Sequence, residues 1–152
     1  MKIFILSLTF FLLTGCQAQT EKERMLETSH KIVETLRSGN EKDFVKFIGP
    51  ELRVVGKDDE MIGFDFLKLK KYFKEYLDFA EPKYVFIDKP NSLGQKKIQV
   101  VFHQGIPKST TDYDVRLDLE FGPPNFFPLS KISGYRIIDK LEALYPTPED
   151  LK

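Results

Sequence analysis

The segment from residue 112 to residue 121 (DYDVRLDLEF) alternates strictly between charged and apolar side chains. Its apolar members share one parity: Tyr113, Val115, Leu117, Leu119 and Phe121. Its charged members share the other parity: Asp112, Asp114, Arg116, Asp118 and Glu120. Successive side chains of a strand point to opposite faces, so this pattern predicts an antiparallel strand with one buried and one solvated face. A sheet of such strands needs an apolar layer on one side only.

Other segments after Pro82 share the period of two and are bounded by turn residues. They predict strands at 83–88, 96–104 and 131–139. Before Pro82 the apolar residues recur at helical spacing. This spacing predicts a helix at 21–38, for which Thr20 to Glu23 have capping-box spacing, a short helix capped by Asn40 and a third helix that begins near Asp65. The sequence therefore predicts an α+β fold, in which N-terminal helices pack on a curved antiparallel sheet of about four strands.

The chain beyond residue 20 shows no internal repeat, low-complexity tract or inter-domain linker. Its length is enough to bury a hydrophobic core without disulfides. We therefore expect a single α+β domain at 21–145, followed by a C-terminal tail at 146–152.

The first residues have the composition of a targeting segment. Lys2 supplies a positive charge, and residues 3–13 (IFILSLTFFLL) form an apolar stretch. This stretch has the length of a secretory signal and is well short of the ~20 residues that cross a bilayer as a helix. The only cysteine of the chain, Cys16, follows closely, so no internal disulfide can form. A signal peptide is therefore predicted at 1–15.

The four residues that end at this cysteine are Leu13, Thr14, Gly15 and Cys16. They resemble the lipobox of bacterial lipoproteins, and this resemblance implies that Cys16 is lipidated and that 16–20 form a short tether. Gln17 and Ala18 follow the cysteine without an Asp, which by resemblance to Gram-negative lipoproteins implies the outer membrane, with the domain facing the periplasm. An ordinary cleaved signal with a coincidental cysteine is the alternative interpretation.

The phrase from Leu36 to Phe44 (LRSGNEKDF), followed by Phe47 and by Pro50-Glu51-Leu52, lies between a long predicted helix and the later elements. This arrangement resembles the nuclear transport factor 2-like superfamily, which has a cone-shaped, cystatin-like fold. The resemblance implies that helices and a curved sheet enclose a pocket. Members use that pocket as an active site, as a binding cleft or as core, so the resemblance does not select a function.

Composition and motifs exclude several classes of function. The chain has 23 basic and 23 acidic residues and so no electrostatic footprint for nucleic acid. It has no HExxH, GxSxG or glycine-rich phosphate motif, and no cofactor is predicted. The acids of 112–121 do not match a calcium loop, since Leu117 stands where such a loop needs glycine. We expect these acids to pair with Arg116, Lys97 or Arg136, or to be solvated.

The two histidines are the candidate titratable groups of a pocket. His30 is placed on the first predicted helix so that it faces inward, where it would share a pocket with Tyr113. A hydrogen-bonded histidine at the edge of the core is the interpretation that we favour, and the pocket is the alternative. His103 shares parity with Lys97 and Gln99, so it is predicted to point outward.

The segment 122–128 (GPPNFFP) joins the last two predicted strands. Turn chemistry explains its glycine and prolines but not the adjacent Phe126 and Phe127. The two rings either fold back over the core or are exposed as an anchor for a partner or ligand. We expect Phe127, next to Pro128, to pack and Phe126 to be the more exposed.

These features predict a membrane-anchored lipoprotein of the cell envelope. Its domain is expected to be a non-enzymatic accessory module, without catalytic residues, that binds an envelope protein or a small apolar ligand. The alternative is a small cone-fold hydrolase or isomerase with an inward His30 and Tyr113 pocket.

Replacement of the cysteine tests the anchor. Cys16→Ser removes the thiol that would carry the acyl chains, so the variant is expected to leave the membrane fraction or to accumulate as unprocessed precursor. Immunoblotting of fractionated envelopes measures both outcomes. A variant that fractionates with the outer membrane like the wild type would show that the lipobox assignment is wrong.

Overall fold

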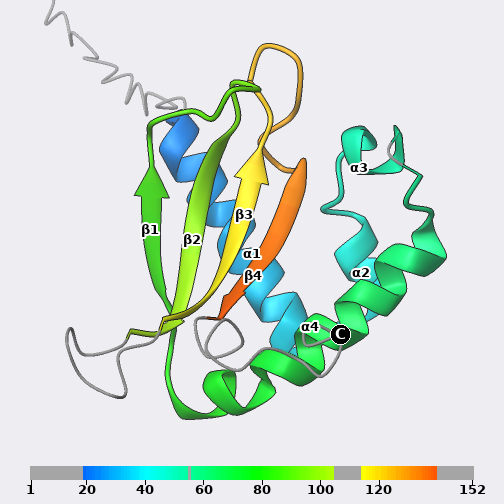
Figure 1. Cartoon of the computed structure of the whole chain (residues 1–152), viewed down its shortest axis with the longest axis vertical. Coiled ribbons are helices and arrows are strands. Elements are labelled where there is room, and N and C mark those ends of the chain that lie inside the picture. The colour runs from blue at the N-terminus through cyan, green and yellow to red at the C-terminus, as the bar shows by residue number, and fades with distance from the viewer. Residues whose placement is uncertain (1–18, 55, 105–113, 140–152) are drawn as a thin grey trace, which may run out of the picture.

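The computed structural model describes residues 19–54, 56–104 and 114–139, apart from the side chains of Arg53 and Val54. In these residues the helices precede the strands (Figure 1). The helices are α1 (Glu21–Ser38), α2 (Glu41–Val45), α3 (Pro50–Val54) and α4 (Asp59–Phe79). The strands are β1 (Lys83–Ile87), β2 (Lys96–His103), β3 (Val115–Phe121) and β4 (Gly134–Asp139). They form one antiparallel sheet in the order β1-β2-β3-β4, which confirms the predicted α+β class.

The first two helices begin at their predicted capping residues. The Thr20 hydroxyl accepts a hydrogen bond from the Glu23 N–H at 3.2 Å, and the Glu23 carboxylate accepts one from the Thr20 N–H at 2.7 Å. This reciprocal pair is a capping box, and α1 has its predicted bounds. Asn40 caps α2, because its side chain accepts a hydrogen bond from the Asp43 N–H at 3.2 Å.

The last helix, α4, begins earlier than the sequence pattern predicts. Its N-cap is Asp58, whose carboxylate accepts a hydrogen bond from the Met61 N–H at 2.8 Å, so the helix begins at Asp59 and the prediction of a start near Asp65 was wrong. Gly63 disfavours a helix just before the predicted start. The Asp58 cap and the burial of Ile62 outweigh that cost. The sequence pattern gives no prediction for α3.

The strands occupy the predicted segments with shorter bounds. β1 and β2 each end one residue before the predicted end, at Ile87 and His103. β4 begins at Gly134 rather than at residue 131, because Ile132 forms an isolated parallel bridge with Ile48 instead. Residues 112 and 113 of the predicted third strand lie outside the described residues.

The helices cover one face of the sheet, with α1 behind the strands in Figure 1. The apolar parity of β3 faces this layer, and its described side chains are all buried: Val115, Leu117, Leu119 and Phe121. Phe73 of α4 stacks on Phe102 of β2 with ring centroids 4.1 Å apart. The core is completed from both layers by Ile32, Leu36, Phe44, Phe66, Leu69, Ile98 and Val100.

Asp118 lies on the opposite face of the sheet, where its parity predicted a solvated side chain. That prediction of exposure was wrong, because the Asp118 side chain is fully buried. Its carboxylate lies 2.9 Å from Lys97 Nζ, 3.2 Å from Arg116 Nε and 4.0 Å from Arg136 Nη2. Long cationic side chains cover the carboxylate, and their positive charges compensate its negative charge. The predicted pairing with these three residues is therefore confirmed for Asp118.

Asp65, Lys57 and Tyr135 link α4 to the sheet. Asp65 accepts hydrogen bonds from Lys57 Nζ and from the Tyr135 hydroxyl of β4, each at 2.5 Å. Partial burial acts to raise the pKa of Asp65, but the hydrogen bonds from Lys57 and Tyr135 outweigh it and hold that pKa below its usual value. Burial and the neighbouring Asp65 raise the pKa of Tyr135.

Asp65→Asn is expected to lower the free energy of unfolding by about 1–2 kcal/mol at neutral pH, because it weakens charge-assisted hydrogen bonds. The pKa of Asp65 is lower in the folded than in the unfolded state. The Asp65 carboxylate therefore makes its full contribution to the free energy of unfolding above the unfolded pKa of about 3.9. This contribution is lost as the pH falls through the pKa of the folded state. Urea denaturation from neutral pH to about pH 3 should show the difference between variant and wild type narrowing.

The matched control for this prediction is Asp78→Asn, which removes an exposed ion pair with Lys74 on the same helix. Exposed pairs of this kind contribute little, so a small effect is expected. A difference between Asp65→Asn and wild type that does not change with pH would contradict the assignment.

Candidate functional site

The structure does not place His30 in an inward pocket. The inward side of this part of α1 is occupied by Ser29, Ile32 and Val33, which are buried, whereas His30 is exposed. Its ring lies against Tyr84 of β1, with the centroids 3.9 Å apart. The prediction that His30 faces inward was therefore wrong. Tyr113, its predicted companion, lies outside the described residues.

His103 lies at the end of β2, where the alternation of the strand is broken. A β-bulge follows Val101, and His103 pairs with Val115 instead of continuing the earlier register. Val115 is fully buried on the face that the helices cover. The parity count that predicted an outward His103 therefore does not hold beyond the bulge. His103 is partly buried.

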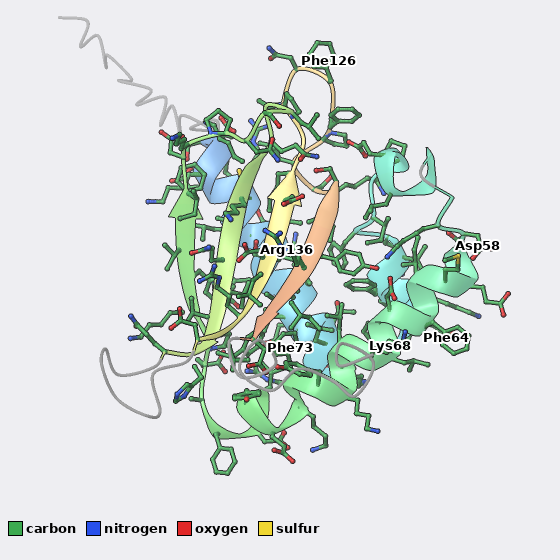
Figure 2. The ribbon with its side chains drawn as sticks, viewed as in Figure 1. Asp58, Phe64, Lys68, Phe73, Phe126 and Arg136 are labelled. Atoms are coloured by element: carbon green, nitrogen blue, oxygen red, sulfur yellow. The ribbon has the colours of Figure 1, made fainter. Side chains whose placement is uncertain are left out.

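The two phenylalanines of the β3–β4 connection have different environments. Phe126 is 79% exposed and lies at one extreme end of the molecule (Figure 2). Phe127 is partly buried, and its ring packs so closely on Gly122 that a Cβ added there would lie 2.5 Å from Phe127 Cδ2. This is the arrangement expected from the sequence, in which Phe127 packs and Phe126 is exposed.

An open groove of about 590 Å3 lies between α2 and α4, on the side of α4 away from the core. Its apolar lining consists of Val45 from α2 and of Phe64 and Leu67 from α4. Phe64 is 60% exposed and Leu67 is 52% exposed, and Figure 2 shows Phe64 projecting away from the sheet. These two residues, with Met61, form a second apolar stripe that the core does not use.

Gly63 forms part of the groove wall inside α4. A Cβ added at this position would approach nothing more closely than the Glu41 side chain, at 3.7 Å, which is an ordinary contact distance. Core packing therefore does not require a glycine here. Glycine inside a helix costs about 1 kcal/mol relative to alanine, so Gly63, which is buried beside Glu41, lowers the stability of α4 without being required by the packing.

The rim of the groove is mainly acidic. Glu41 of α2 and Asp59 and Glu60 of α4 border it, with Lys42 as the basic residue among its lining. The acids of α4 lie in its first turn, where the helix dipole also favours negative charge. An apolar strip with an acidic border is complementary to a surface that is both apolar and basic.

Sequence reasoning missed this groove. The late predicted start of the third helix left residues 59–64 out of that helix. The signal that could have revealed the groove was the spacing of Met61, Phe64 and Leu67. These residues recur every third position after the capping residue Asp58, beside a separate buried stripe.

Several other features bear on the interpretation. In the described part of the chain, no cluster of three or more His, Cys, Asp or Glu residues could hold a metal ion. No helix in those ranges is both long and apolar enough to span a membrane. Cys16 lies outside them. No protein family model, curated protein or solved structure matches the chain.

Replacement of Phe126 or Phe127 by alanine tests the different environments of the two rings. Phe127→Ala is expected to lower the free energy of unfolding by about 1–2 kcal/mol, since a partly buried ring is lost. Phe126→Ala is expected to change it by less than about 0.5 kcal/mol, as for other exposed positions. Thermal denaturation of the two single variants measures both effects. Equal losses in the two variants would contradict the assignment.

Proposed function

We propose that this chain is a lipid-anchored, non-enzymatic binding module of the cell envelope, built on a nuclear transport factor 2-like cone. The lipobox-like Leu13 to Cys16 behind the apolar stretch 3–13 supports the anchor. The order of helices before an antiparallel sheet, together with the phrase from Leu36 to Phe44, supports the cone. By the sorting resemblance of Gln17 and Ala18, the anchor is in the outer membrane and the domain faces the periplasm.

The binding surface in this proposal is the groove between α2 and α4, and the observation that carries it is the pair Phe64 and Leu67. Both side chains are more than half exposed beside Gly63, a helix glycine that the core does not need. Contiguous apolar surface of this kind is typical of sites that bind proteins, membranes or ligands. The acidic rim selects among partners, because it complements positive charge.

The partner that fits this surface is a protein segment with apolar side chains flanked by Lys or Arg. A small apolar ligand fits less well, because sites for small molecules bury most of the ligand, whereas this groove is open along one side of α4. An amphipathic helix laid along the groove would place apolar residues on Phe64 and Leu67 and basic residues near Glu41 and Glu60.

Photo-crosslinking in intact envelopes tests the groove. A benzoylphenylalanine introduced at Leu67 in the full chain is expected to give a discrete adduct whose partner peptide is apolar and basic. The matched control places the same group at Phe79, which is 90% exposed on the same helix but lies outside the groove. No adduct, or equal adducts at Leu67 and Phe79, would contradict the proposal.

Two further substitutions separate binding from stability. Phe64→Ala should reduce the adduct at Leu67, because loss of an aromatic anchor typically costs about 2 kcal/mol of binding. Gly63→Ala should also reduce it by narrowing the groove, while raising the melting temperature through a gain of up to about 1 kcal/mol in helix propensity. An adduct with a second copy of the chain, or with its own residues 140–152, would show that the proposed partner is wrong.

A further inference from the structure

Two exposed apolar side chains lie at the same end of the domain. Leu93, in the connection from β1 to β2, is 71% exposed, and Phe126, in the connection from β3 to β4, is 79% exposed. Both connections lie at the upper end of the sheet in Figure 1, and Figure 2 shows Phe126 at the extreme of that end. The connections touch, since a Cβ added at Gly94 would lie 3.3 Å from the side chain of Pro123.

Hydrogen bonds of the backbone order both turns. The Leu93 N–H donates to the Asn91 side chain at 2.9 Å, and the Asn91 N–H donates to the Gln95 carbonyl at 2.9 Å, which closes a tight turn. On the other connection the Phe126 N–H donates to the Pro123 carbonyl at 3.0 Å. Leu93 and Phe126 are therefore presented by ordered turns.

The start of α1 lies at this same end of the molecule (Figure 1). Glu21 forms an ion pair of 3.2 Å with Lys96 at the beginning of β2. The Thr28 hydroxyl donates to the Leu129 carbonyl at 2.8 Å, which joins α1 to the connection that carries Phe126. The helix start and the two turns are thus parts of one connected end of the domain, which we call the tip.

The covalent chain brings the tip close to the proposed lipid anchor. Four residue steps separate Cys16 from Thr20, the N-cap of α1, and a fully extended chain covers roughly 14 Å over that distance. If Cys16 carries acyl chains, the end of the domain with Leu93 and Phe126 is held near the bilayer. Apolar side chains at the membrane interface lie at the boundary between headgroups and acyl chains.

We propose that the tip is a second membrane contact, in which Leu93 and Phe126 enter the interface of the bilayer that holds Cys16. This inference rests on the lipid anchor of the proposed function and is independent of the groove. The contact is apolar and requires no anionic lipid. It orients the domain and leaves the groove accessible from solution, because Phe64 lies on the side of the molecule away from Phe126 (Figure 2).

The chain contains no tryptophan, so a single introduced tryptophan reports on its own surroundings. The experiment uses the full lipidated chain with Phe126→Trp, reconstituted into vesicles of phosphatidylcholine with or without brominated acyl chains. The control is Phe79→Trp, which replaces a residue that is 90% exposed at the end of α4, just before β1 enters the sheet from the opposite end.

The Phe126→Trp emission is expected to shift to shorter wavelength on reconstitution and to lose about half or more of its intensity with brominated lipid, as for a side chain at the acyl boundary. Leu93→Trp should behave in the same way, and Phe79→Trp should show neither change. Flotation of the vesicles on a density gradient reports the anchor separately.

Two results would overturn the inference, and they are distinguishable. If the protein floats with the vesicles but the tryptophan at position 126 is as unshifted and unquenched as that at position 79, the tip contact is wrong and the anchor stands. If the protein does not float, both the anchor and the inference that depends on it are wrong.

Discussion

The apolar face of β3 is the constraint on which the rest of the structure depends. Its four described apolar side chains, from Val115 to Phe121, are buried almost completely, and they lie on a central strand of the sheet. A sheet with one such face is stable only when another layer covers it. The chain supplies that layer from its first half, where α1, α2 and α4 contribute Ile32, Phe44 and Phe73 to the same core.

The way in which α4 covers the apolar face of the sheet also creates the groove between α2 and α4. The helix has 21 residues, and its buried stripe faces the core while Asp65 is fixed through Lys57 and Tyr135. Its second apolar stripe then cannot face the core, because side chains on opposite sides of a helix point in different directions. Phe64 and Leu67 are left beside α2, where the acids of the first turn of α4 and Glu41 give the groove its charge.

The sheet determines where the ends of the domain lie relative to one another. In an antiparallel sheet of consecutive strands, alternate connections lie at the same end of the strands. The β1–β2 and β3–β4 connections therefore meet at one end, beside the start of α1. In the proposed anchored state this end faces the lipid and α4 lies at the side of the domain. The partner surface and the membrane surface then do not compete for the same residues.

The sequence by itself determined the features that depend on neighbouring residues. The capping box at Thr20, the Asn40 cap and the alternation of β3 are local patterns, and they correctly predicted α1, α2 and the class of the sheet. The lipobox resemblance is also local, and it remains a prediction because Cys16 lies outside the described residues. The start of α4 was predictable in principle from Asp58, but Gly63 obscured it.

Only the tertiary structure decided which side of each element is covered. His30 faces Tyr84 because Ile32 and Val33 occupy the core side of α1, and local spacing cannot rank these alternatives. Asp118 is buried because Lys97, Arg116 and Arg136 reach over it from three strands. Phe64 and Leu67 are exposed because no other described element lies over that side of α4. Each outcome depends on residues distant in sequence, and a periodic pattern along one segment contains no information about them.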